Sequence, residues 1–128
     1  RLHALTGRED LRGFAAGALR RFGPRLTERP LAMPYMLCAL DLSLTPPAAV
    51  LIAGLDLPGA AELLAAARRT PWAVLSGFTA ATREETARLI PAAAGATPGP
   101  RARAFVCAGG ACGLPVEDPA ELTRRLAA

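Results

Sequence analysis

Two cysteines near the end of the chain are the strongest candidates for chemistry. Four residues separate Cys107 from Cys112, with Gly-Gly at the centre of the gap. Such a centre would let the sulfur atoms approach disulfide distance, and the pair would also serve as half of a metal site. The spacing differs from the two-residue gap of redox helices and zinc knuckles, and no other Cys/His pair completes a tetrahedral set. Burial of Cys107 on a strand is the leading interpretation, because free cysteine is among the most buried residue types. A redox pair and a metal site are the alternatives.

The other polar candidates have ordinary structural explanations. His3 has no acidic partner nearby in the sequence, so we interpret it as a surface or interface histidine and not as a general base. The adjacent carboxylates Glu84/Glu85 and Glu117/Asp118 point apart when they start a helix, where they favour the helix dipole. We therefore predict no catalytic residue, no bound metal and no cofactor in this chain.

A glycine after the first apolar strand stands where a Rossmann phosphate loop would begin. The segment Ile52–Asp56 contains Gly54 but lacks the second and third glycines of G-x-G-x-x-G. Leu55 and Leu57 would also crowd a pyrophosphate. A lone glycine at a strand end is usually a turn residue, so nucleotide binding is not favoured.

The composition predicts a folded chain without a membrane segment. The 128 residues are 52% hydrophobic, enough for one domain or two small lobes with a buried core. Charged residues, proline or glycine interrupt each apolar stretch before it reaches the roughly 18 residues that a membrane span needs. The chain begins at Arg1 without the basic and apolar regions of a signal peptide, so we expect a fragment of a longer protein.

The charge pattern does not favour a nucleic-acid partner. The net charge is +4 and the basic residues are all arginine, scattered except for pairs at 20–21, 68–69 and 124–125. Each pair lies at or near a predicted helix C-terminus, where cations favour the dipole. Aromatic residues make up 5% of the chain, which leaves few rings for base stacking. Three cysteines, an odd number without secretory features, favour a reducing compartment over a disulfide scaffold, and we expect a cytoplasmic location.

The first third of the chain has helical periodicity. A short helix ends at Gly7, and a second begins at Glu9 and follows an i, i+3, i+4 pattern to Phe22, where we expect Gly23-Pro24 to end it. A third helix is predicted from Pro34 to Leu44. It is apolar nearly all round, which is typical of a helix buried on several sides, yet its sequence neighbours include a single full-length helix to cover it.

From position 47 onward, apolar runs alternate with helical stretches. The runs 49–53, 72–75 and 104–107 are predicted to be buried strands, and helices are expected at 59–69, at 82–90 and after Pro119. This β-α-β-α-β-α order predicts an α/β fold with a small three-stranded parallel sheet. We place the domain boundary after the third helix, which divides the chain into 1–46 and 47–128.

Two stretches resemble the C-terminal end of the YyaL-like, spermatogenesis-associated thioredoxin-like proteins. The first, LCALDLSLTPPAAVLIAG (37–54), has an Ala-Leu-Asp helix, a Pro-Pro break and a strand ending in glycine. The second, AFVCAGGACGLPVEDPAEL (104–122), matches an aromatic-Val-Cys-x4-Cys-x2-Pro-Val-x-Asp-Pro-x-x-Leu tail. Together they cover 37 of the 128 residues, and the tail is the specific part.

The resemblance implies a parent protein that joins a thioredoxin-like domain to an (α/α)6 barrel of the six-hairpin glycosidase type. Residues 1–46 would then be the last helices of the barrel, with Met33 and Tyr35 as candidates to line a sugar pocket. Packing of both side chains in the core is the favoured alternative. The remainder of the parent chain would be the partner of this fragment. The implied function is that of a non-catalytic C-terminal segment in a protein with a thiol- or carbohydrate-related role. The alternatives are a free-standing α/β ligand-binding module and a thiol-redox protein that uses Cys107 and Cys112.

Overall fold

The chain folds around a mixed four-stranded sheet with helices on both faces. The computed structural model describes residues 1–108 and 111–127. The strands are β1 (Ala49–Ala53), β2 (Val74–Phe78), β3 (Arg103–Ala108) and β4 (Ala111–Cys112), in the order β2-β1-β3-β4. The helices are α1 (Leu2–Thr6), α2 (Glu9–Glu28), the 3-10 turn η1 (Pro30–Ala32), α3 (Pro34–Leu44), α4 (Ala60–Arg68), α5 (Arg83–Leu89), α6 (Ala92–Gly95) and α7 (Pro119–Ala127). The predicted α/β class is confirmed.

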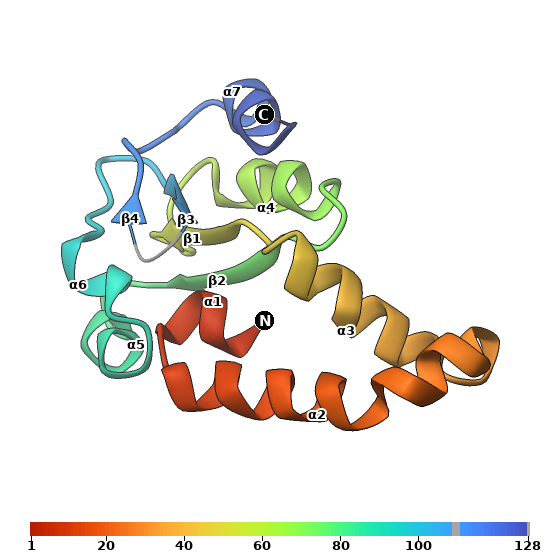
Figure 1. Cartoon of the computed structure of the whole chain (residues 1–128). Helices are drawn as coiled ribbons and strands as arrows, with labels where there is room; N and C mark the ends of the chain where they lie inside the picture. The colour runs from red at the N-terminus through yellow and green to blue at the C-terminus, as the bar shows by residue number, and fades with distance from the viewer. Residues whose placement is uncertain (109–110, 128) are drawn as a thin grey trace.

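The central strand β1 separates two apolar cores. All five of its residues are buried, and because side chains alternate along a strand, they divide between the two faces of the sheet. Val50 and Ile52 pack with α4, α7 and Val116, while Leu51 packs with Phe78 and the α5–α6 segment on the other face. Figure 1 shows the same layers, with α4 and α7 above the sheet and α1, α5 and α6 below it.

The third strand corrects the prediction of a three-stranded parallel sheet. β1 and β2 are parallel, but β3 runs antiparallel to β1, with Ala53 opposite Arg103 and Ala49 opposite Cys107. A parallel crossover usually returns the chain through one helix. Between β2 and β3 the chain instead forms two short helices, α5 and α6, separated at Ile90 and Pro91. It then enters β3 beside the C-terminal end of β1, with Arg103 opposite Ala53.

The segment after β3 forms a hairpin that the sequence analysis did not predict. β4 pairs antiparallel with β3, and an isolated bridge joins Ala104 to Val116 with two backbone hydrogen bonds of 2.8 Å. The Asp118 carboxylate then accepts the N–H groups of Ala120 and Glu121 and so caps α7. The tail is thus fastened to β3 before the last helix begins.

Helix α2 is longer than predicted. It continues through Gly23 and Pro24 to Glu28, although proline lacks the N–H that an interior helical position donates. The Thr27 hydroxyl donates to the Gly23 carbonyl at 3.2 Å, and Leu26 is buried in the same turn. Burial of a leucine contributes about 2 kcal/mol, which offsets most of the roughly 3 kcal/mol that proline costs inside a helix. The prediction that Gly23-Pro24 ends the helix was wrong.

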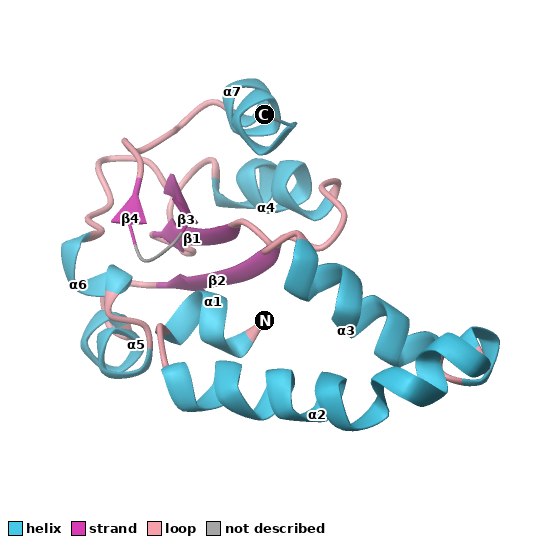
Figure 2. Cartoon of the chain, in the orientation of Figure 1, coloured by secondary structure: helices cyan, strands magenta, loops and turns pink. Residues whose placement is uncertain are grey.

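The helical arm, which we define as α1 to α3, is covered far less than the sheet. Among residues 1–48, all of which the structure describes, Leu26 alone is buried. Figure 2 shows α2 and α3 extending together away from the strands, joined at their far ends through η1. Leu5 of α1 packs against the core around Leu51, so the arm is attached to the sheet through its first helix.

Candidate functional site: the Cys107–Cys112 hairpin

The sheet brings the two tail cysteines together. Cys107 lies on β3 and Cys112 on β4, directly opposite each other, and their sulfur atoms form a disulfide. The Cα atoms are 3.9 Å apart. The sequence analysis favoured burial of Cys107 and left a redox pair and a metal site as alternatives. In the structure Cys107 is buried and is also bonded to Cys112. The Gly-Gly centre of the spacing lies outside the described residues.

The strand register explains why these two sulfurs meet. The neighbouring pair is joined by a backbone hydrogen bond from Gly113 N–H to Val106 O, at 2.9 Å. Hydrogen-bonded and non-hydrogen-bonded pairs alternate along an antiparallel ladder, so the cysteines occupy a non-hydrogen-bonded position, where facing side chains are closest. A two-residue Gly-Gly sequence between two strands is typical of a tight hairpin, and it is the pattern from which this pairing could have been predicted.

The two cysteines differ in their access to solvent. Cys107 is 7% exposed and packs in the core with Leu51, Phe78 and Phe105. Cys112 is exposed. The third cysteine, Cys38, is free and half-buried on α3. A reagent in solution therefore meets the disulfide from the Cys112 side.

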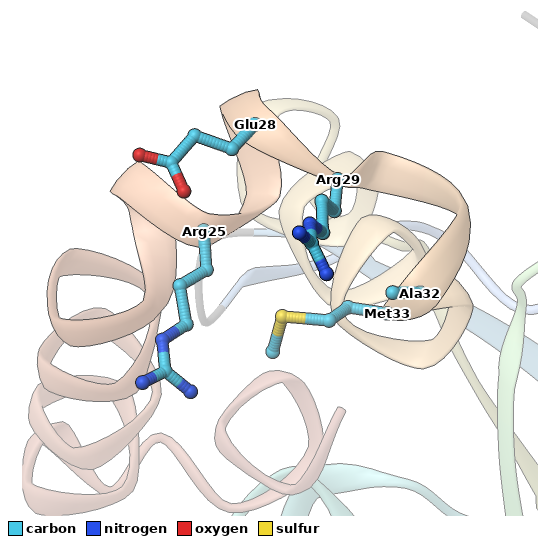
Figure 3. A pocket seen from close by; sticks show the side chains of 5 residues that line it. All are labelled: Arg25, Glu28, Arg29, Ala32 and Met33. Atoms are coloured by element: carbon cyan, nitrogen blue, oxygen red, sulfur yellow. The ribbon is translucent and has the colours of Figure 1, made fainter.

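A hollow at the tip of the helical arm contains one of the two residues proposed to line a sugar pocket. It has a volume of about 330 Å³ and is lined by Arg25, Glu28, Arg29, Ala32 and Met33. In Figure 3 the Arg29 side chain extends toward Met33, while the Glu28 carboxylate points away. Tyr35, the other proposed residue, is 91% exposed and is not among the lining residues. Arg25 and Arg29 were not among the predicted site residues, because the sequence does not distinguish them from the other arginines of this basic chain.

A second hollow lies over α5 and α6. Its volume is about 410 Å³, and its lining residues include Arg83, Glu84 and Ala94. The Arg83 guanidinium donates to the Ala94 carbonyl at 2.7 Å, so its position is explained by tying α5 to α6. Neither hollow contains a cysteine, a serine or a histidine among its lining residues.

The loop after β1, which begins at Gly54, packs closely and its first two N–H groups are already hydrogen-bonded. Gly54 has a φ of 85°, which favours glycine, and a Cβ there would lie 2.6 Å from Leu57 Cδ1. The N–H groups of Gly54 and Leu55 both donate to the Phe78 carbonyl, at 2.9 and 3.1 Å. Since a phosphate loop must offer its N–H groups to the ligand, this arrangement agrees with the interpretation of Gly54 as a turn residue.

His3 and Glu117 form local contacts. The His3 Nδ1 lies 3.1 Å from the Arg8 carbonyl, and its Nε2 lies 3.8 Å from Glu9 Oε1, an acidic neighbour that the sequence analysis did not anticipate. Glu117 forms an ion pair with Arg103 at 2.7 Å. These contacts occur at exposed or half-exposed positions and connect neighbouring elements.

The carboxylates of Asp10, which is exposed, and Glu121, which is half-buried, have lowered pKa values. Hydrogen bonds from Arg125 and Arg124 lower the pKa of Glu121 below its ordinary value. The hydrogen bond from Arg8 lowers the pKa of Asp10 in the same way. Both groups are ionised near neutral pH, so they hold helix ends and do not act as proton donors.

No set of three metal-ligating side chains comes together within residues 1–108 and 111–127. In the same residues, no helix combines the length and apolar character needed to cross a membrane. None of the protein-family models, curated proteins and solved structures compared with the chain matches it.

Proposed function

We propose that this chain is a non-catalytic packing segment of a larger protein similar to the YyaL-like family. In this proposal the helical arm completes an (α/α)6 barrel, and the α/β unit covers the outside of that barrel. The thiol- or carbohydrate-related role of the parent is implied by the sequence resemblance. Its cytoplasmic location is proposed from the odd number of cysteines without secretory features. The observation that carries the proposal is the apolar and uncovered state of α3.

Helix α3 has the composition of a buried helix in an exposed position. Asp41 is the single charged residue among its eleven, and none of the eleven is buried. Tyr35 is 91% exposed and Leu44 is 74% exposed. A helix that is apolar all round is usually enclosed by other helices. Large exposed apolar side chains on one helix are typical of a surface that other elements cover.

The charges of the arm indicate what kind of surface covers it. Between positions 20 and 29 the arm carries four arginines, at 20, 21, 25 and 29, and one acidic residue, Glu28. A second copy of this arm would bring like charges together. An apolar helix surface rimmed by acidic residues would complement the arm, and the remaining helices of a barrel would supply such a surface.

The test compares hydrophobic-dye binding and self-association of the purified chain with those of matched variants. The wild-type chain should bind the dye and aggregate. Replacing Tyr35 and Leu44 by glutamine should lower both, because these side chains account for much of the exposed apolar surface of α3. Leu114→Gln is the control, since Leu114 is equally exposed, at 77%, but lies near the hairpin.

The alternative is a free-standing α/β ligand-binding module, which is supported by the two well-formed cores of the sheet. It predicts the opposite behaviour. A compact monomer that melts cooperatively and binds no dye would overturn the packing proposal and favour the module. Equal effects of the α3 variants and of Leu114→Gln would also count against the packing proposal.

A further inference from the structure

We propose that the Cys107–Cys112 disulfide is a thiol–disulfide exchange site, reduced by a dithiol that attacks the sulfur of Cys112. This inference concerns the hairpin and not the helical arm, so it goes beyond the packing function. It assigns a reaction to the exposed side of the hairpin, which the packing proposal does not involve.

Access determines which sulfur is attacked. The incoming thiolate must approach one sulfur in line with the S–S bond and expel the other. Cys112 is exposed on the short outer strand β4, whereas Cys107 is buried beside Phe105. Cys112 is therefore the electrophile, and Cys107 is the leaving group.

The exchange moves two electrons and two protons. A thiolate of the dithiol forms a bond to Cys112 Sγ, the Cys107–Cys112 bond breaks, and Cys107 leaves as a thiolate that takes up a proton. The second thiol of the reductant, as a thiolate, then attacks the reductant sulfur that is bonded to Cys112. This step releases the Cys112 thiolate, which is also protonated. The products are the Cys107/Cys112 dithiol and the reductant in its disulfide form.

The hairpin geometry explains why a dithiol is the effective reductant. Backbone hydrogen bonds lie on one side of the pair, from Gly113 N–H to Val106 O and, further along, in both directions between Ala104 and Val116. They do not depend on the S–S bond, so they hold the sulfurs in register after it breaks. A monothiol bound to Cys112 would be expelled by the adjacent Cys107, because the oriented thiolate has a high effective concentration. A dithiol avoids this reversal by completing the second step itself.

The first experiment counts thiols in the Cys38→Ser variant, in which every thiol belongs to the pair. It should show no thiol after oxidation by glutathione disulfide and two after dithiothreitol, with an unchanged far-ultraviolet circular dichroism spectrum. Rapid alkylation during reaction with reduced glutathione, followed by peptide mapping, should find glutathione on Cys112 and the alkyl group on Cys107. Any of three results would overturn the proposal. The variant could show two thiols under both conditions, its thiols could be released only after urea unfolds the chain, or glutathione could be found on Cys107.

The second experiment tests the role of the backbone. Gly113→Pro removes the N–H that donates to Val106, and it should lower the ratio of disulfide to dithiol in a fixed glutathione buffer by up to about fivefold, the equilibrium effect of one such hydrogen bond. Gly113→Ala is the matched control, because a Cβ there meets Val106 O at an ordinary 3.6 Å and the N–H is kept. Equal ratios in the two variants would show that the ladder does not hold the sulfurs.

Discussion

Removing the disulfide tests how much this bond stabilises the fold. The variant Cys107→Ala/Cys112→Ala deletes both sulfurs and leaves the flanking backbone hydrogen bonds in place. The two cysteines are five positions apart, so the bond closes a loop of six residues. For a loop of that size the chain-entropy relation gives about 2 kcal/mol at 25 °C. This is a large share of the 5–15 kcal/mol by which a domain of ordinary stability is folded.

Urea denaturation followed by circular dichroism measures this difference. All the stability comparisons use the Tyr35→Gln/Leu44→Gln background, which the packing proposal expects to aggregate less, and in them wild type means the native residue at the tested position. The variant should unfold at a urea concentration lower by about 1 M, given ordinary values of the denaturant slope. The wild-type chain in dithiothreitol should match the variant closely, since both lack the bond. Coincident unfolding curves for oxidised and reduced wild-type chain would refute the reasoning, because they would mean that the loop is equally constrained without the bond.

Three further outcomes follow from single positions. Gly54→Ala should destabilise the chain by about 2 kcal/mol, since it puts a Cβ at a positive φ and against Leu57, and thermal unfolding would show whether the Tm falls. Leu122→Ala should cost about 3 kcal/mol, because Leu122 is the fully buried anchor of α7, and an unchanged Tm would contradict its place in the core. Because Arg125 and Arg124 lower the pKa of Glu121, its stabilising contribution is complete above the ordinary carboxyl pKa and is lost as pH falls through the lower folded-state value. The Tm difference between wild type and Glu121→Gln should therefore shrink in acid and remain constant between pH 6 and 8, roughly the range in which the carboxylate stays ionised.

The elements that depend on local sequence could be predicted. The helix that begins at Pro34 has the expected bounds, the strand at 49–53 is confirmed, and Gly7 ends the first helix in the left-handed conformation. Asp118 caps α7 just before Pro119, as the sequence order suggested. In each case the determining residues lie within one or two turns of the feature that they fix.

The features that depend on residues far away in the sequence could not be predicted from it. Whether Pro24 ends a helix depends on whether Leu26 finds a buried place, and the direction of β3 depends on the whole connection 79–102, in which α5 and α6 replace a single crossover helix. Thr82 is at the predicted N-terminus of α5, yet its hydroxyl accepts the Thr79 N–H and not a bond from within the helix. The candidate site divides in the same way. The pairing of Cys107 was an open alternative, and the partner strand that decides it was not predicted.

The position of β3 beside β1 also determines how long one edge of β1 stays unpaired during synthesis. One side of β1 is completed by β2, which follows within about 20 residues, but the other side must wait for β3, which begins at Arg103. At ordinary translation rates of about 5–20 residues per second, the fifty or so residues between Ala53 and Arg103 take roughly 3–10 s to make. During that interval the apolar sequence AVLIA has an unpaired edge, which is the kind of segment that pairs with other nascent chains. The third strand to be synthesised is thus the one that covers the open edge of the first.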